Sequence, residues 1–226
     1  MLAKLQKATD KVFSVLSDLN HANIYYSQTG EDIILRDIFW KKDNGFYVDI
    51  GAHHPKRFSN TYLLYKKGWS GINVDADKRS IELFLRHRKR DINLNLAVSD
   101  KKRELEFFEF NDGAINTFSQ EEAKRIALSR KETPKKYSLQ TVTLKYLLDT
   151  YLPKDKNIDL LTIDIEGFDE KALKSNDWKK YRPNYILVEM FDSPFKKEHK
   201  SIIKLLERNG YEFYAKTNIT AIFKRK

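Results

Sequence analysis

Along the chain, segments with the hydrophobic pattern of a β-strand alternate with segments that have the pattern of an α-helix. Short apolar runs of strand length are followed by segments whose apolar residues recur three and four positions apart. The predicted strands cover residues 46–50, 71–75, 92–98, 105–110, 158–165 and 185–190. The predicted helices cover residues 60–67, 78–90, 120–130, 143–152, 169–174 and 198–209. Strands that alternate with helices predict a mostly parallel sheet with helices on both faces.

The chain ends in two further strand patterns, residues 211–216 and 220–224, with only three residues between them. Three residues cannot hold a helical crossover, so this pair is predicted to be antiparallel. Residues 111–138 are the least regular part, and we interpret them as an insertion over the sheet edge or the substrate side. The predicted fold class is α/β, a doubly wound, mostly parallel seven-stranded Rossmann-like sheet with a terminal antiparallel hairpin.

The first residues differ from the rest, because residues 1–22 read as an amphipathic helix that precedes a single domain over residues 23–226. We expect this helix to pack on the domain surface, and the alternative is a peripheral contact with a membrane or with a second copy. The segment lacks the apolar core and cleavage site of a signal peptide, and the chain contains no cysteine. Both observations favour a cytoplasmic protein.

The chain is basic, with 42 Lys and Arg against 32 Asp and Glu and a formal net charge of +10. This charge is explained either by solubility or by an anionic partner, such as nucleic acid, an anionic membrane surface or a phosphorylated substrate. The densest basic cluster, residues 86–90, closes a predicted helix. Cations at that position stabilise the negative end of the helix dipole.

A candidate ligand site follows from the strand ends, because sheets of this kind bind ligands beyond the carboxyl ends of their strands. The first strand runs into residues 49–53, DIGAH, and the second ends at Asp75. An acid at the second position can accept hydrogen bonds from both ribose hydroxyls, and Gly51 permits close backbone approach. The chain lacks both G-x-G-x-x-G and G-x-x-x-x-G-K-[ST], and Asp49 would repel phosphates. The pattern favours S-adenosylmethionine, which carries an adenosine, two cationic groups and no phosphate.

Longer segments strengthen this interpretation. They are SQTGED (27–32), FYVDIGA (46–52), SNT (59–61), GWSGINVDA (68–76), NLAVSD (95–100) and LLTIDIEG (160–167). In these segments the chain resembles the FkbM-type S-adenosylmethionine-dependent methyltransferases, from about residue 25 to its end. The resemblance implies a class I methyltransferase fold and methyl transfer to a hydroxyl, often on a sugar, a glycan or a polyketide.

The resemblance also implies roles for individual residues. Asp49, Gly51 and Ala52 would line the methionine end of the cofactor, Asp75 would hold the ribose, and residues 95–97 would border the adenine. The sequence departs from the family at His53 and Pro55, where Asn-x-Gly is more usual. The full set of predicted cofactor-binding residues is Gln28, Asp49, Gly51, Ala52, His53, Asp75, Ala76, Asn95, Ala97 and Asp164.

Methyl transfer to an alcohol needs an aligned acceptor and a group that removes the hydroxyl proton. The predicted catalytic residues are Asp164, Glu166 and His53, with His54 and Glu189 as further candidates. Side chains alternate between the two faces along a strand, so Asp164 and Glu166 are expected to point to the same side. The alternative for Asp164 is a hydrogen bond to the cofactor only, and the alternative for Glu166 is a helix cap.

The acceptor is predicted to contact Ser59, Asn60 and Glu189, although the first two also suit a helix N-cap. Phe118, Tyr137 and residues 111–120 are candidates for a lid or an acceptor wall. The carboxylates of Asp164, Glu166 and Glu189 suit Mg²⁺ or Ca²⁺ in principle, but their spacing does not require an ion, so no metal is predicted.

Two other functions stay open at this point: a nucleic-acid methyltransferase and a non-catalytic adenosine-binding scaffold. The net charge suggests the first, but Asn/Asp-Pro-Pro-Tyr/Phe is missing after the fourth strand. The acidic segment 164–167 that stands there is a poor neighbour for a phosphate backbone. We therefore expect a small-molecule or glycan acceptor as the partner, and no nucleic acid.

Overall fold

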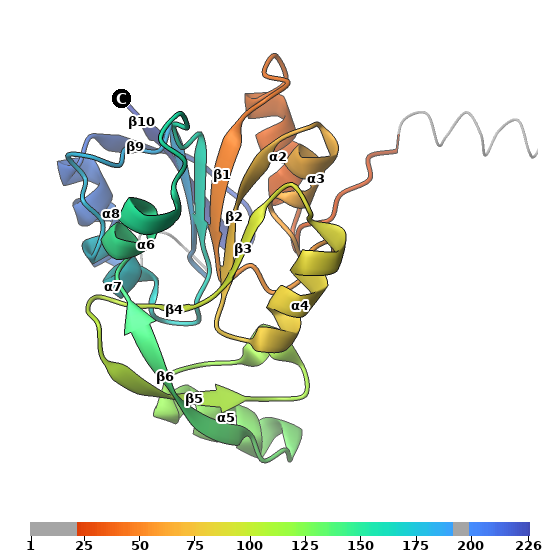
Figure 1. Ribbon diagram of the computed structural model, residues 1–226, viewed down its shortest axis with the longest axis vertical. Helices are drawn as coiled ribbons and strands as arrows, with labels where there is room; N and C mark the ends of the chain where they lie inside the picture. The colour runs from red at the N-terminus through yellow and green to blue at the C-terminus, as the bar shows by residue number, and fades with distance from the viewer. Residues whose placement is uncertain (1–21, 192–198) are drawn as a thin grey trace, which may run out of the picture.

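The computed structural model describes residues 22–191 and 199–226 (Figure 1). The amphipathic helix predicted for residues 1–22 lies outside this part of the chain, apart from its last residue. A seven-stranded sheet in the order β3-β2-β1-β7-β8-β10-β9 forms the centre. Its strands are β1 (Phe46–Ile50), β2 (Ser70–Asp75), β3 (Ile92–Asn95), β7 (Leu160–Ile163), β8 (Tyr185–Glu189), β9 (Tyr211–Lys216) and β10 (Thr220–Arg225).

The sheet has the predicted direction of its strands. The pairs from β3 through β8 are all parallel, and β10 is antiparallel to both of its neighbours. The strand order reverses between β1 and β7, which is the switch point where such sheets bind ligands. The predicted α/β class, the seven strands and the terminal hairpin are confirmed.

Helices cover both faces of this sheet (Figure 1). They are α2 (Glu31–Ile38), α3 (Tyr62–Lys66), α4 (Lys78–His87), α6 (Leu144–Tyr151), α7 (Asp169–Lys174) and α8 (Lys200–Arg208). Apolar residues of α2 and α3 pack with one face, and those of α6, α7 and α8 pack with the other. All five residues of β1 are therefore buried, which explains why four of them are apolar and Asp49 is the exception.

A second, three-stranded sheet, β4-β6-β5, lies at the carboxyl end of the first one (Figure 1). Its elements are β4 (Ala97–Val98), β5 (Glu104–Glu109), η1 (Gly113–Ile115), α5 (Gln120–Arg130) and β6 (Lys135–Val142). The single strand predicted over residues 92–98 is wrong, because the chain leaves the main sheet after Asn95 and pairs next with β6. The irregular insertion predicted over residues 111–138 contains α5, as expected from residues 120–130, and the start of β6, which the sequence pattern missed.

Two predicted helix caps are also wrong. The N-cap of α3 is Thr61, and its hydroxyl donates to Asp49 Oδ2 at 2.8 Å instead of capping. Asn60 Nδ2 donates to Thr162 Oγ1 on β7 at 3.2 Å. The N-cap of α7 is Phe168, so Glu166 does not cap that helix.

One arginine of the basic cluster at residues 86–90, Arg88, is fully buried. Arg88 follows α4 and has no exposed surface, and its Nε donates to Asp91 Oδ2 at 2.9 Å. Its guanidinium also donates to the Tyr47 hydroxyl at 2.6 Å, the Pro55 carbonyl at 2.9 Å and Thr61 Oγ1 at 3.1 Å. The interpretation of this cluster as cations at a helix end therefore fails for Arg88, which ties α4 to β1 and to the turn after β1.

Candidate functional site

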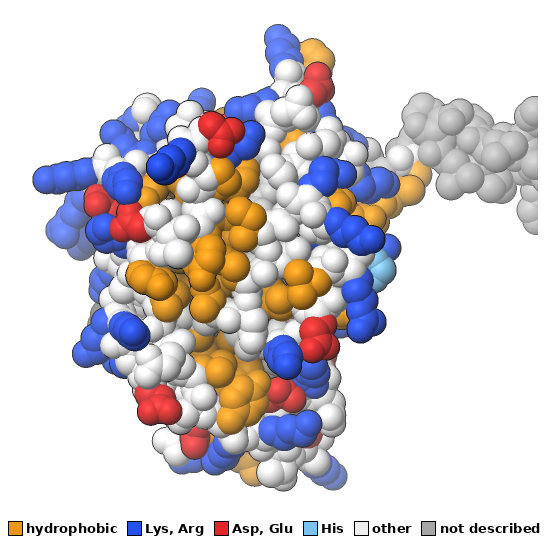
Figure 2. Space-filling model, viewed as in Figure 1, with side chains coloured by type: hydrophobic (Ala, Val, Ile, Leu, Met, Phe, Trp, Pro, Cys, Tyr) orange, Lys and Arg blue, Asp and Glu red, His pale blue; other side chains and the backbone are white. Residues whose placement is uncertain are grey.

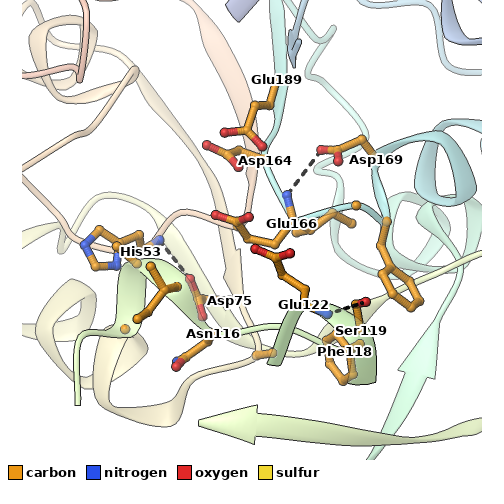
Figure 3. A pocket seen from close by; sticks show the side chains of 18 of the residues that line it. His53, Asp75, Asn116, Phe118, Ser119, Glu122, Asp164, Glu166, Asp169 and Glu189 are labelled. Carbon is orange, nitrogen blue, oxygen red and sulfur yellow. Dashed lines mark hydrogen bonds between the residues drawn. The ribbon is translucent and has the colours of Figure 1, made fainter. Parts of the chain in front are cut away.

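A cavity of about 1170 Å³ opens at the carboxyl ends of β1, β2, β7 and β8, between the main sheet and the insertion (Figure 3). Most of the residues predicted from the strand ends and from the segment before α2 line it. These residues are Gln28, Asp49, Gly51, Ala52, His53, Ser59, Asn60, Asp75, Ala76, Asp164, Glu166 and Glu189. The cavity therefore lies where the sequence predicted a ligand site, at the carboxyl ends of the strands.

Asn95 and Ala97 do not line the cavity. Asn95 Nδ2 donates to the carbonyls of Asp75 and Ala76 at 2.9 Å each, and Ala97 pairs with Thr141 in the small sheet. Asn95 thus fixes the backbone at the end of β2. A cofactor contact for these two residues stays a prediction.

The turn after β1 lies very close to the end of β7. Gly51 has a φ of +81°, and a Cβ atom there would lie 1.7 Å from the Asp164 carbonyl oxygen. Only glycine combines this left-handed conformation with such a close approach. The contact holds the turn after β1 against the strand end that carries Asp164.

A pair of glycine substitutions tests this contact. Gly51→Ala is expected to lower the free energy of unfolding well beyond the effect of Gly167→Ala, since Gly167 has a φ of +87° but open space around it. Gly167→Ala is expected to lose only about 1–2 kcal/mol, because its one cost is a non-glycine residue in the left-handed conformation. Urea unfolding of both variants measures the difference, and equal losses would contradict the close approach of Gly51 to Asp164.

Asp49 and Asp75 are held by different partners. Asp49 is buried and accepts the Thr61 hydroxyl, and burial raises its pKa to about 6 although Thr61 and the charge of Arg88 oppose this. Asp75 accepts the backbone N–H of His53 at 2.8 Å and that of Asp77 at 2.7 Å. Burial raises the pKa of Asp75 to about 7, against these two hydrogen bonds. Asp75 therefore joins the first two strand ends across the crevice.

His53 lies at the entrance of this crevice with a left-handed backbone, φ 52°. Burial, and then the charge of Arg57, lower the pKa of His53 to about 4. The imidazole is therefore neutral at neutral pH and a weak base. Its Nδ1 atom is buried and has no hydrogen-bond partner within residues 22–191 and 199–226.

Three carboxylates meet at the ends of β7 and β8 (Figure 3). One oxygen from each of Asp164, Glu166 and Glu189 lies within 4.8 Å of the others. The left-handed conformations of Glu166 (φ 47°) and Gly167 (φ 87°) form the turn that follows β7. The predicted meeting of Asp164 and Glu166 is confirmed, and Glu189 joins them.

The closeness of these groups changes their acidity. Burial, and then the charge of Glu189, raise the pKa of Asp164 well above its ordinary value. Burial, and then the charge of Glu166, raise the pKa of Glu189 to about 8. Burial also raises the pKa of Glu166 to about 7, with the charge of Asp169 adding to it. The group therefore holds protons at neutral pH unless a cation compensates its charge, and its oxygens are ligands that Mg²⁺ or Ca²⁺ prefers.

The insertion forms the opposite wall of the cavity. Phe118 lines it and packs against Phe107 and Phe168, with ring centroids 4.9 and 5.6 Å away. Asn116 Nδ2 donates to Asp77 Oδ2 at 3.0 Å, which joins the insertion to the end of β2. The wall predicted for residues 111–120 is present, but Tyr137 does not line the cavity, because its hydroxyl donates to Glu109.

Sequence reasoning missed several residues that line the cavity. Asp169 is buried and its Oδ1 accepts the Ile165 backbone N–H at 3.2 Å. Glu122 and Arg125 form an ion pair on α5 beside the carboxylates. An acid at a helix start and an i,i+3 ion pair are ordinary surface patterns, so neither carried a signal of the site.

A family model matches most of the chain. The model of the methyltransferase FkbM domain matches residues 49–213. A TehB-like SAM-dependent methyltransferase from Corynebacterium glutamicum shares 11% identity at a TM-score of 0.44, over 98% of this chain and 100% of that chain. An O-methyltransferase from Bacillus cereus in complex with SAH shares 12% identity at a TM-score of 0.42, over 95% and 88%. No curated protein matches the chain.

Proposed function

Because the chain belongs to the FkbM methyltransferase family, whose cofactor is S-adenosylmethionine, we propose that it methylates a hydroxyl of a sugar, a glycan or a related natural product. The observation that carries the proposal is the group of Asp164, Glu166 and Glu189 at the switch point. A carboxylate with a pKa near neutrality is suited to remove the proton of a hydroxyl, which is a poor nucleophile until it loses that proton.

The residues at the strand ends suit the cofactor. Gly51 lines the cavity and lets the first turn lie against the end of β7, and Asp75 lies where a ribose is held in sheets of this kind. The cofactor carries an ammonium and a sulfonium, and such cations beside the carboxyl groups of Asp49 and Asp164 would favour their ionised forms against the effect of burial. The unpartnered His53 Nδ1 leaves one more buried polar atom beside this crevice for a ligand.

Each carboxylate of the group has a different part in the proposed reaction. Bound S-adenosylmethionine supplies a methyl group activated by positively charged sulfur. Glu166 has a lower pKa than Glu189 and accepts the acceptor's hydroxyl proton. Glu189, with a pKa of about 8, keeps a proton at neutral pH and can donate a hydrogen bond that orients the acceptor, while Asp164 can form a hydrogen bond to the cofactor.

The opposite wall suits an uncharged polyhydroxylated acceptor. Phe118 and Phe168 offer apolar ring surface to the cavity, and sugar rings pack on such surfaces through their C–H faces. Nine acidic side chains line the cavity against three basic ones, Arg125, Arg130 and Lys171, and this balance disfavours a phosphate backbone. These observations favour a sugar or glycan over a nucleic acid as the acceptor.

Calorimetric titration tests the cofactor assignment. We expect purified protein to bind S-adenosylmethionine and S-adenosylhomocysteine but not NAD or ATP. Asp75→Ala is expected to weaken both affinities about 10- to 100-fold, since it removes a hydrogen bond to a charged group. A melting curve checks that the variant is folded, and unchanged affinity in a folded variant would contradict the role of Asp75.

A screen of acceptors then tests the reaction. Sugars, glycans and oligonucleotides are incubated with cofactor, and mass spectrometry detects the added methyl group. O-methylation of a sugar or glycan supports the proposal, whereas methylated oligonucleotide supports the nucleic-acid enzyme. Cofactor binding without transfer to any acceptor supports the non-catalytic scaffold.

A further inference from the structure

A second cavity, of about 810 Å³, lies at the opposite end of the main sheet, where β1, β7 and β8 begin. Six basic side chains from separate segments converge on it. They are Lys42 before β1, Lys154 and Lys156 before β7, Lys180 and Arg182 before β8, and Arg225 at the end of β10. Leu148, Leu152, Pro153 and Ile158 give the cavity an apolar part. The proposed reaction uses none of these residues.

The two carboxylates in this lining already have partners. Asp159 is buried and accepts Lys42 Nζ at 2.6 Å, the Phe46 backbone N–H at 3.0 Å and Asn184 Nδ2 at 2.9 Å. Asp149 accepts Lys180 Nζ and the Tyr181 hydroxyl at 2.6 Å each. Neither carboxylate therefore neutralises the other basic side chains of the cavity.

Four cations of the lining keep their charge for a ligand. No ion pair within the described residues involves Lys154, Arg182 or Arg225, and Lys156 pairs only with the exposed Asp155 at 3.4 Å. Arg225 and Arg182 each donate one nitrogen to a backbone carbonyl, which fixes their direction and leaves further N–H groups. Such a group of cations beside an apolar surface suits an anion that carries an apolar part.

An exposed tryptophan lies in the loop that brings Lys42 to this cavity. Trp40 is 67% exposed in the loop between α2 and β1, two residues before Lys42, and Lys41 Nζ lies 5.0 Å from its ring centroid. This loop projects from the upper end of the molecule in Figure 1, and Figure 2 shows basic side chains at that end. Tryptophan flanked by lysine is the combination that proteins place at the boundary between lipid and water.

The cavities at the two ends of the main sheet differ in the charge of their lining. The cavity at the amino end of the sheet is lined by six basic side chains and two acids, whereas the cavity at the carboxyl end is lined by nine acids and three basic side chains, Arg125, Arg130 and Lys171. An anionic surface is therefore bound more favourably by the amino end than by the rim of the carboxyl-end cavity. This orientation leaves the candidate active site open to solvent.

We propose that the amino end of the sheet docks on an anionic lipid surface, with a headgroup phosphate in the basic cavity and Trp40 at the membrane interface. Among the described residues, no helix is long and apolar enough to cross a membrane, so the contact is peripheral. Single-stranded nucleic acid is the less favoured partner, because it stacks successive bases on several aromatic rings and this loop offers one.

Vesicle sedimentation with the full chain tests the proposal. We expect binding to phosphatidylcholine vesicles that contain phosphatidylglycerol, weakened by salt, and little binding to phosphatidylcholine alone. The double variant Lys154→Glu/Lys156→Glu is expected to bind at least about 10-fold more weakly. Lys101→Glu/Lys102→Glu changes the net charge equally in the exposed turn between β4 and β5, and is expected to bind like the wild type.

Tryptophan emission gives an independent readout. Addition of the anionic vesicles is expected to shift the emission to the blue, and Trp40→Phe is expected to abolish the shift, because Trp69 is buried and Trp178 is partly buried. Melting curves check that all variants are folded. Equal binding to neutral vesicles, equal weakening in both double variants or unchanged binding in Lys154→Glu/Lys156→Glu would overturn the proposal, as would binding to an oligonucleotide but not to vesicles.

Discussion

Replacing Glu166 with glutamine is expected to lower kcat for methyl transfer about 100- to 10,000-fold, the usual contribution of a general base. Glutamine keeps the size and polarity of the side chain but cannot accept the hydroxyl proton. Affinity for S-adenosylhomocysteine is expected to stay unchanged, because the substitution leaves Asp49, Gly51 and Asp75 in place. Calorimetry and a methyl-transfer assay with the identified acceptor measure the two quantities.

The dependence on pH distinguishes a base from a residue that only shapes the cavity. In the wild type, Glu166 must be ionised to accept a proton, so kcat falls about tenfold per unit as pH drops below about 7. Glu166→Gln is expected to lose this dependence. Glu122→Gln is the matched control in the same cavity, since Glu122 pairs with Arg125, and it is expected to retain both rate and profile. A wild-type profile in Glu166→Gln would assign the base elsewhere.

Arg88→Met is expected to lower the free energy of unfolding by about 3–5 kcal/mol. The substitution removes the cation of a pair whose two side chains have no exposed surface, and leaves Asp91 buried without it. It also removes donors to the Tyr47 hydroxyl and to Thr61, whose hydroxyl holds Asp49. We therefore expect weaker cofactor binding in addition to lower stability.

A second Arg–Asp pair three residues apart provides the control. Arg103 pairs with Asp100 at 2.8 Å, and the side chains are 32% and 38% exposed. Arg103→Met is expected to cost at most about 1 kcal/mol, as exposed ion pairs do. Urea unfolding compares the two variants directly. Similar losses would show that the burial of Arg88 adds nothing to the stability.

The sequence predicted the main sheet well because its strands carry their own signal. β1 and β7 are buried on both faces, so each is apolar apart from one residue, Asp49 or Thr162. The short connection before β10 dictates an antiparallel hairpin. β6 was missed because it is exposed along most of its length and begins with two lysines after a proline. It pairs with β5 and β4, and pairing with distant strands leaves no mark in the local sequence.

The sequence predicted the site residues that follow the strands but not those that depend on contacts between distant segments. The strand ends identified Asp49, Asp75 and Asp164, since parallel strands bring their carboxyl ends to one edge. Nothing local marks Arg88 within residues 86–90, because which of five adjacent polar side chains turns inward depends on the packing of α4 against β2 and β3. Asn116 joins the site only because the insertion folds back over β2.

The small sheet has a consequence for how this protein can evolve. The chain enters it at Ala97 and leaves it at Val142, and β4 and β6 are paired where this happens. The ends of the inserted segment are therefore neighbours, so changes in its length place little strain on the main sheet. The predicted cofactor contacts at the strand ends come from the main sheet, whereas Phe118 and its wall come from the insertion. Acceptor preference can therefore diverge through this one segment while the methyl donor stays the same.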